Sequence, residues 1–196
     1  MGLRVPVEEF RCLSLEAHSI LTGVPLRDVT AIDLSGGGEG RTLADVRALL
    51  AGSWESGARG LVAALFALRS WIGRRLGWDE ARHDRPEASY LSHVPPSVRA
   101  RSVIAPGSPD GVFRTLYALD GESVSEIRNA TVHAFLCAAL VPRAAGYRMY
   151  WAVYVQPVSR WTPIYMALIE PFRRFVVYPS LFARIAKRWR HRYRPT

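Results

Sequence analysis

The chain has 196 residues, of which 49% are apolar and 11% aromatic, so it is long enough to bury the core of one domain. Cys12 and Cys137 are its only cysteines, which excludes a disulfide framework and a cysteine metal cluster, and no run of about 18 uncharged apolar residues offers a transmembrane helix. The net charge of +9 comes from one segment: residues 171–196 hold eight basic and no acidic residues, and without them 18 basic against 17 acidic residues leave +1.

The basic residues are 25 arginines and Lys187, a bias that a GC-rich genome produces as readily as selection for phosphate contacts does. No nucleic-acid recognition motif accompanies the charge, so we do not expect a nucleic-acid partner. The first residues reach Glu8 and Glu9 without an apolar run and therefore do not form a secretory signal. We expect a cytoplasmic protein, with peripheral contact to a membrane left open.

The first half of the chain predicts one strand and two helices. Residues 29–35 form a short β-prone run that stops at the glycines 36–38. Thr42 is a candidate N-cap, with Asp45 three residues later, for a helix over residues 43–50. Leucines and one isoleucine that recur every three or four residues predict a second helix over 61–76.

Residues 79–110 contain five prolines and predict a long surface excursion with at most one strand, around residues 98–104. Beyond Gly111 the composition becomes β-prone. Asp120-Gly121 and Ala145-Gly146 are hairpin signals. We therefore expect consecutive antiparallel strands over 113–119, 124–141, 147–156 and 163–169.

Alternation along residues 147–156 assigns the two faces of that strand. Odd positions are apolar, whereas Arg148 and Gln156 indicate that the even face is more polar. The run 124–141 does not show which parity points inward. Within it, Arg128 with Glu126, or Asn129 with Thr131, is a candidate polar end of a pocket, although neighbours two apart on a strand often pair for structure alone.

The end of the chain predicts a basic amphipathic helix. Glu170 and Pro171 suit a helix start, and the interior Pro179 predicts a bend near Val177 or a restart capped by Ser180. The apolar side of residues 172–185 is expected to pack on the sheet, with the early arginines solvated on the opposite side.

The stretches SEIRNATVHAFLCAALVP and GYRMYWAVYVQPVSRWTPIYMALIEPFRRFVVYPSLFARI resemble a bacterial family of unknown function in the START and polyketide-cyclase (SRPBCC) superfamily. The order of elements also resembles its helix-grip fold. That resemblance implies an α+β fold in which a curved antiparallel sheet wraps a long C-terminal helix, with two shorter helices after the first strand. It divides the chain into an N-terminal extension (1–27), one helix-grip domain (28–190) and a basic tail (191–196).

The superfamily implies a cavity between the sheet and the terminal helix, used for lipids, polyketides or other apolar molecules. We expect a small apolar ligand there and no cofactor or metal. An alternative is a cyclase- or dehydratase-like enzyme in the same cavity, with His133 as a proton-transfer group; a hydrogen-bonded, purely structural His133 is the competing interpretation. The cavity candidates are Phe113, Tyr117, Arg128, His133, Phe135, Met149, Trp151, Val153, Phe175 and Phe182.

The sequence lacks the motifs for phosphate binding, metal binding and hydrolase catalysis. The glycines 36–40 have no Gly-Lys-Ser/Thr ending and predict a turn, not a phosphate loop. The five histidines never fall in a metal-binding spacing, and no Gly-x-Ser-x-Gly elbow occurs. No catalytic residue is therefore assigned.

The third hypothesis is peripheral binding to an anionic membrane through the basic end of the chain, with Trp189 and Tyr193 at the interface. The oligomeric state is not indicated. The candidate cations are Arg184, Lys187, Arg188, Arg190, Arg192 and Arg194.

Overall fold

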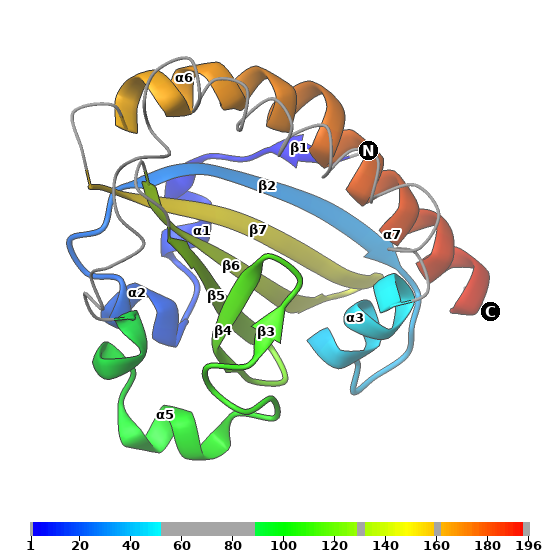
Figure 1. The fold of residues 1–196 in the computed structure, drawn as a ribbon. Helices are drawn as coiled ribbons and strands as arrows, with labels where there is room; N and C mark the ends of the chain where they lie inside the picture. The colour runs from blue at the N-terminus through cyan, green and yellow to red at the C-terminus, as the bar shows by residue number, and fades with distance from the viewer. Residues whose placement is uncertain (1, 52–88, 129–131, 159–161, 194–196) are drawn as a thin grey trace.

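A computed structural model describes residues 2–51, 89–128, 132–158 and 162–193. In these residues an antiparallel sheet of seven strands has the order β1-β2-β7-β6-β5-β4-β3 (Figure 1). The first long strand lies beside the last, and the others follow as a meander. The strands are β1 (Leu3–Arg4), β2 (Leu26–Ser35), β3 (Pro109–Asp110), β4 (Phe113–Ala118), β5 (Glu122–Arg128), β6 (Val132–Arg143) and β7 (Gly146–Pro157).

Helices cover both faces of this sheet. On one face a long helix, formed by α6, η4 and α7, runs across β2 and β7 together with α3; on the other face lie α1, α2 and α5 (Figure 1). The fold is therefore α+β with a long C-terminal helix. The helical segments are α1 (Val7–Arg11), α2 (Glu16–Ile20), α3 (Leu43–Ala51), η3 (Tyr90–His93), α5 (Pro96–Arg101), α6 (Thr162–Phe172), η4 (Arg173–Val177) and α7 (Tyr178–Arg192).

Both predicted hairpins are present. Asp120-Gly121 joins β4 to β5, and Ala145-Gly146 joins β6 to β7. The prediction of one strand over 124–141 was wrong, because β5 and β6 are two strands that pair with each other. The odd residues of β6 face α1 and α2, and its even residues face the long helix. The helix predicted over 61–76 lies outside the described residues.

The N-terminal segment is part of the same core. β1 pairs with β2, while Phe10 of α1 and Ile20 of α2 are buried in one cluster with residues of β5, β6 and β7. This cover explains why the even face of β7 is not the more polar one: Tyr150 and Tyr154 are buried there beneath α1 and α2. The polarity of Arg148 was a misleading signal, because that residue lies at the end of the strand in ion pairs.

Two predicted strands are helices. Residues 163–169 belong to α6, where Pro163 occupies the first turn and Tyr165, Met166 and Ile169 pack on the sheet at helical spacing. Residues around 98 belong to α5, which begins at Pro96 and buries Val98. In both segments β-prone residues adopt a helix because the helix places its apolar residues against the sheet.

The irregularity caused by Pro179 takes the form of a π-helical turn. A proline removes one backbone donor and collides with the carbonyl four residues earlier, here that of Phe175. The wider turn η4, Arg173–Val177, lies there, so the helix continues without a restart capped by Ser180. Beyond it, Phe182, Ile185 and Trp189 are buried against the sheet and α3.

The glycines after β2 form a turn around Trp189. Gly37 has φ +101°, and a Cβ atom there would lie 2.7 Å from the Trp189 ring, so glycine is required. The Thr42 N–H donates to Asp45 Oδ2 at 2.9 Å, so the acidic residue of the predicted capping box makes its expected hydrogen bond at the start of α3. Within the described residues, no helix combines the length and the hydropathy that crossing a membrane requires.

Candidate functional site

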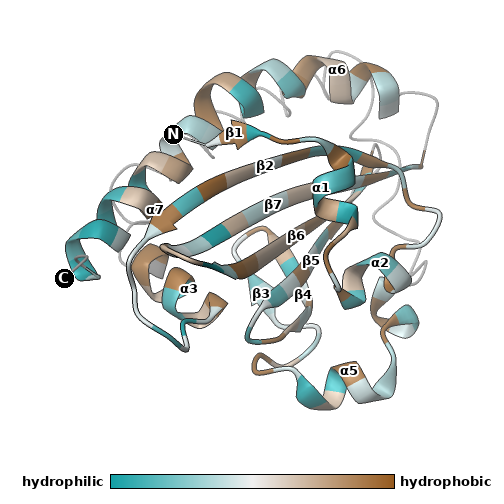
Figure 2. Cartoon of the chain, turned by 180° about the vertical axis from the view of Figure 1, so that it is seen from behind, coloured by the Kyte–Doolittle hydropathy of each residue, from teal (hydrophilic) through white to brown (hydrophobic). Residues whose placement is uncertain are grey.

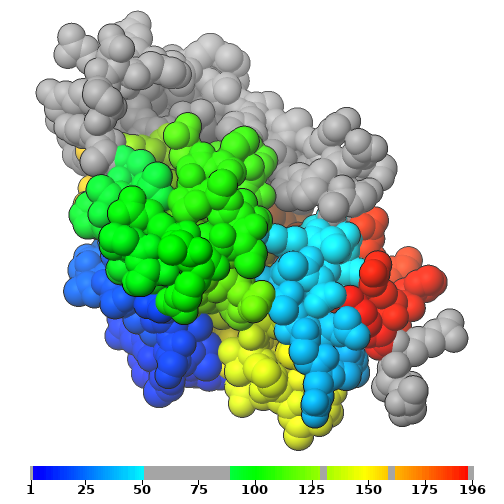
Figure 3. Space-filling view, turned by 90° about the horizontal axis from the view of Figure 1, so that it is seen from below, coloured from blue at the N-terminus to red at the C-terminus, as the bar shows by residue number. Residues whose placement is uncertain are grey.

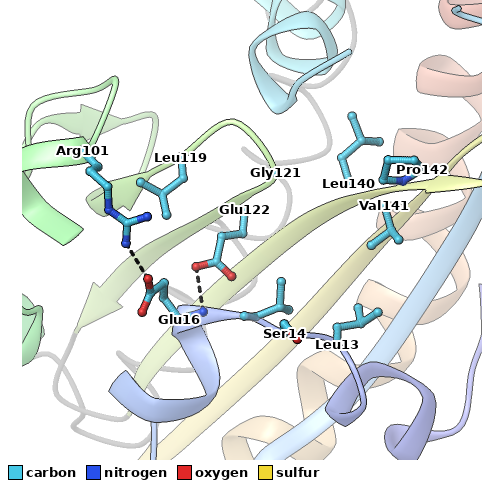
Figure 4. A pocket seen from close by; sticks show the side chains of 11 residues that line it. Leu13, Ser14, Glu16, Arg101, Leu119, Gly121, Glu122, Leu140, Val141 and Pro142 are labelled. Atoms are coloured by element: carbon cyan, nitrogen blue, oxygen red, sulfur yellow. Dashed lines mark hydrogen bonds and ion pairs between the residues drawn. The ribbon is translucent and has the colours of Figure 1, made fainter. Parts of the chain in front are cut away.

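A groove of about 640 Å³ opens on the sheet face that α1 and α2 cover (Figure 4). Its walls come from the segment before α2, from α5, from the β4–β5 hairpin and from the end of β6. In the space-filling view the N-terminal segment (blue) lies beside the segment with α5 and β4 (green), whereas α3 (cyan) lies beside α7 (red) (Figure 3). The lining residues are Leu13, Ser14, Leu15, Glu16, Arg101, Leu119, Gly121, Glu122, Leu140, Val141 and Pro142.

Glu122 is the buried polar group of this groove, with 5% of its surface exposed. It begins β5 directly after the hairpin and shares a face with Val124, which turns its carboxyl toward α2. The Glu16 N–H and the Tyr117 hydroxyl both donate to Oε1, each at 3.0 Å. Within the described part of the chain, Oε2 is buried and has no hydrogen-bond partner.

The surroundings favour the neutral form of this carboxyl. Burial raises the pKa of Glu122, and the negative charge of Glu16 acts in the same direction. The Tyr117 hydroxyl and the backbone N–H of Glu16 oppose the rise without cancelling it. Glu122 thus resembles the carboxyl groups with a raised pKa that occur in ligand and active sites.

The mouth of the groove carries an ion pair between Arg101 of α5 and Glu16 of α2. Both side chains are more than one-third exposed, so the pair contributes little stability. The pair holds the Arg101 guanidinium group at the edge of the groove, beside Glu16 (Figure 4). The groove therefore combines leucine side chains, one buried carboxyl and one exposed cation.

A second buried carboxyl, that of Glu126, lies four residues further along the same strand and on the same face of the sheet. Glu126 Oε2 accepts hydrogen bonds from the Tyr90 N–H at 3.0 Å and from His133 Nε2 at 2.8 Å, and Oε1 accepts one from the Ser89 hydroxyl. Burial alone would raise the pKa of Glu126, but these hydrogen bonds hold it below its ordinary value. His133 therefore contacts a carboxylate in a buried network, and Glu126 pairs with it and not with the exposed Arg128.

The opposite face of the sheet holds a third polar group, beneath the π-helical turn. Asp28 of β2 accepts from Arg173 through Oδ2 and from the Tyr178 hydroxyl through Oδ1 at 3.2 Å. Burial raises the pKa of Asp28 in spite of the Arg173 charge. Arg173 Nε is buried without a hydrogen-bond partner among the described residues. The expectation that the early arginines are solvated was therefore wrong for Arg173.

The predicted cavity residues fall on both faces of the sheet and do not form one lining. Met149, Trp151 and Val153 face the long helix, and Phe182 of that helix packs against this side of the sheet. Tyr117, His133 and Phe135 face α1, α2 and η3. Phe113 is half-buried on β4, Arg128 is exposed, and Phe175 is 70% exposed on η4.

The predicted cations also differ in their surroundings. Arg188 donates to the Leu49 carbonyl and is half-buried, as is Arg184. Lys187, Arg190 and Arg192 are exposed. Arg194 lies outside the described residues. Within the ranges that the structure describes, no cluster of three or more His, Cys, Asp or Glu could hold a metal ion.

The sequence analysis missed Glu122, Asp28 and Arg173. A signal for Glu122 was present, because the Asp120-Gly121 turn fixes the start of β5 and alternation then places Glu122 on the Val124 face. No local signal marks Asp28 and Arg173 as partners, since they lie 145 positions apart in the sequence and meet only where the π-helical turn packs on β2.

Comparison with protein families gives one match. The family described as "Protein of unknown function (DUF2867)" matches residues 20–180, which is most of the chain and includes β2, Glu122, Glu126 and the π-helical turn. Searches of curated proteins and of solved structures found no match.

Proposed function

We propose that the chain, which belongs to the DUF2867 family, binds a small and largely apolar molecule in the groove beside Glu122. The observation that carries the proposal is a set of apolar walls around one buried carboxyl with an unused oxygen. Binding pockets for small molecules have this composition: mostly apolar lining with few polar groups that orient the ligand. A hydroxyl or ammonium group that enters the groove supplies the partner that Oε2 lacks among the described residues.

The carboxyl defines the ligand chemistry. A hydroxyl group can donate to Oε2 when Glu122 is ionised and accept from it when Glu122 carries its proton, and an ammonium group can pair with the ionised form. A carboxylate finds a partner only in the protonated form and meets a second negative charge in the ionised one. The walls contributed by Leu13, Leu119 and Val141 fit an aliphatic or aromatic body. The expected ligand is an amphipathic alcohol or amine.

We also propose that the fold is the helix-grip fold of the START-like superfamily. The pairing of β2 with β7, the meander of β3 to β7 and the long helix after β7 support this assignment. It adds a second candidate position, between the sheet and the long helix. There Arg173 Nε, which has no hydrogen-bond partner among the described residues, lies beside Asp28 and Tyr178 and can donate to an acceptor group of a ligand.

The contacts of His133 do not support the catalytic alternative. Its Nε2 is engaged by Glu126 and its side chain is 5% exposed, as expected for a structural histidine. We therefore propose no reaction for this chain.

Thermal-shift and native mass-spectrometry measurements with decanol, decylamine and decanoate test the proposal. The alcohol and the amine should raise the melting temperature and form a one-to-one complex, and decanoate should do so least. Ser14→Trp should abolish these effects, because Ser14 is exposed in the groove and an indole would fill it. Ser19→Trp, on exposed surface of α2 outside the groove, is the matched control.

The two candidate ligand positions, the groove beside Glu122 and the space beneath the long helix, predict opposite effects of the variants on ligand binding. If the groove is the site, Ser14→Trp removes binding and Arg173→Gln retains it, each variant being compared with its own melting temperature without ligand. Loss of binding in Arg173→Gln alone would move the site to the long-helix face. If none of the three probes binds the protein, ligand binding of this class is refuted.

A further inference from the structure

The outer side of the long helix exposes large apolar side chains. Ile164 and Leu168 of α6 are 52% and 46% exposed, and Phe175 of η4 is 70% exposed. Ile164 and Leu168 lie four residues apart on one side of α6, and Phe175, within the π-helical turn, is the most exposed of the three. The buried side is fixed independently by Tyr165 and Met166, which pack on the sheet. These three exposed residues, called the apolar stripe below, therefore face away from the core.

The same helix becomes cationic along α7. Phe182, Ile185 and Trp189 are buried, so Lys187 and Arg190 are turned to the solvent. Figure 2 shows the end of α7 as strongly hydrophilic (teal). No acidic residue follows Glu170 in the chain. The exposed side of one continuous helix thus passes from apolar to positively charged.

Arg174 connects the two halves. It is exposed, and its guanidinium carbon lies 5.5 Å from the centre of the Phe175 ring. An aromatic ring beside a cation, at the boundary of an apolar and a basic segment, matches the boundary between lipid acyl chains and anionic headgroups.

We propose that this outer side of the long helix docks on an anionic lipid bilayer. The apolar stripe enters the headgroup and acyl boundary, while Arg174, Lys187 and Arg190 contact lipid phosphates. The surface differs from the one expected from the sequence, since Trp189 is fully buried with its Nε1 donating to the Ser35 carbonyl, and the Tyr193 hydroxyl donates to Asp45. The apolar contribution comes instead from α6 and η4.

Charge and shape favour a bilayer over a protein partner. The surface is a single convex helix without acidic groups beyond Glu170, which suits a plane of negative charge. Both components are needed, because neither a few exposed apolar side chains nor a few cations gives stable membrane binding alone.

Co-sedimentation of the full chain with large unilamellar vesicles tests the proposal. Vesicles of phosphatidylcholine mixed with phosphatidylglycerol should bind the protein, and vesicles of phosphatidylcholine alone should bind it weakly. Phe175→Ser should lower the affinity about tenfold. Lys187→Gln with Arg190→Gln should lower it about fivefold for each charge and reduce its dependence on salt.

Matched controls separate this surface from general basicity. Arg99→Gln with Arg114→Gln removes the same charge from exposed positions on α5 and β4, and Val103→Ser removes an apolar side chain that is 62% exposed. These controls should leave vesicle binding unchanged. The proposal is overturned if anionic vesicles bind no better than neutral ones, or if the controls weaken binding as much as the helix variants do. It is equally overturned if the apolar stripe is instead an interface between two copies of the chain. In that case light scattering shows a dimer that Phe175→Ser dissociates, and the same substitution leaves vesicle binding unchanged.

Discussion

Glu122 and Glu126 lie four residues apart on β5 and face the same side of the sheet, yet their surroundings are opposite. Each has 5% of its surface exposed. Glu126 accepts hydrogen bonds at both oxygens, from Ser89, Tyr90 and His133. Glu122 accepts its two hydrogen bonds at one oxygen only, which leaves the other without a partner among the described residues.

The pKa values follow from this difference. Equal burial penalises both charges, but three donors including an imidazole hold the pKa of Glu126 below its ordinary value, whereas burial raises the pKa of Glu122. Burial alone therefore does not determine the state of a carboxyl; the number of donors and their distribution over the two oxygens do. Glu126 is a satisfied structural group, and Glu122 retains capacity for a further partner.

The largest expected effect is the loss of the Glu126 network. Glu126→Ala removes the acceptor shared by Ser89, Tyr90 and His133 and should lower the free energy of unfolding by about 3 kcal/mol. Urea denaturation measures this change. Glu39→Ala, at an exposed carboxylate, is the control and should stay within about 0.5 kcal/mol of the parent. A cost for Glu126→Ala no larger than that of the control would show that the network does not stabilise the fold.

The pH dependence of stability should differ in sign between the two carboxyls. With a raised pKa, Glu122 keeps its proton longer in the folded state, so its contribution is greatest below its ordinary pKa of 4.5 and falls as the pH rises through the raised value. With a lowered pKa, Glu126 contributes above its ordinary pKa and loses this contribution as the pH falls through the lowered value.

Melting temperatures of Glu122→Gln and Glu126→Gln between about pH 4 and about pH 8 separate these contributions. Relative to the parent, Glu122→Gln should become more stable as the pH rises, because it removes a buried charge. The cost of Glu126→Gln should be greatest at neutral pH and shrink toward acid pH. Parallel curves for the two variants would contradict the assignment of opposite pKa directions.

Much of the sheet could be predicted from the sequence because its signals are local. The two hairpin turns predict where β4 gives way to β5 and β6 to β7, and the acidic residue after Thr42 predicts the start of α3. The break between β5 and β6 was missed, and Arg148 misled the assignment of the faces of β7. The burial of Glu122 could not be predicted from local signals alone. Alternation places it on the Val124 face, but only the contact of β5 with α2, more than a hundred residues earlier, makes that face an interior.

The long helix shows why other features could not be predicted. Residues 163–169 are β-prone, and their helical form depends on packing of Tyr165 and Met166 against strands distant in sequence. An α-helical spacing carried through 173–177 also misplaces Arg173. The π-helical turn holds more residues than an α-helical turn, so it changes the direction of the side chains around it and brings Arg173 to Asp28.

The smallest expected effect comes from the donor to Glu122. Tyr117→Phe removes one of the two hydrogen bonds at Oε1 and should lower the free energy of unfolding by about 1 kcal/mol. Tyr154→Phe is the matched control, since Tyr154 is also buried but its hydroxyl lies 3.4 Å from His18 Nδ1, at the limit of a hydrogen bond.

Because the Tyr117 hydroxyl lowers the pKa of Glu122, the loss of that hydroxyl in Tyr117→Phe should raise the pKa of Glu122 further. The cost of Tyr117→Phe should therefore be greater at about pH 8, where Glu122 must ionise with one donor fewer, than at about pH 5. In the double variant Tyr117→Phe with Glu122→Gln this pH dependence should vanish, and its persistence would mean that another group titrates in the groove.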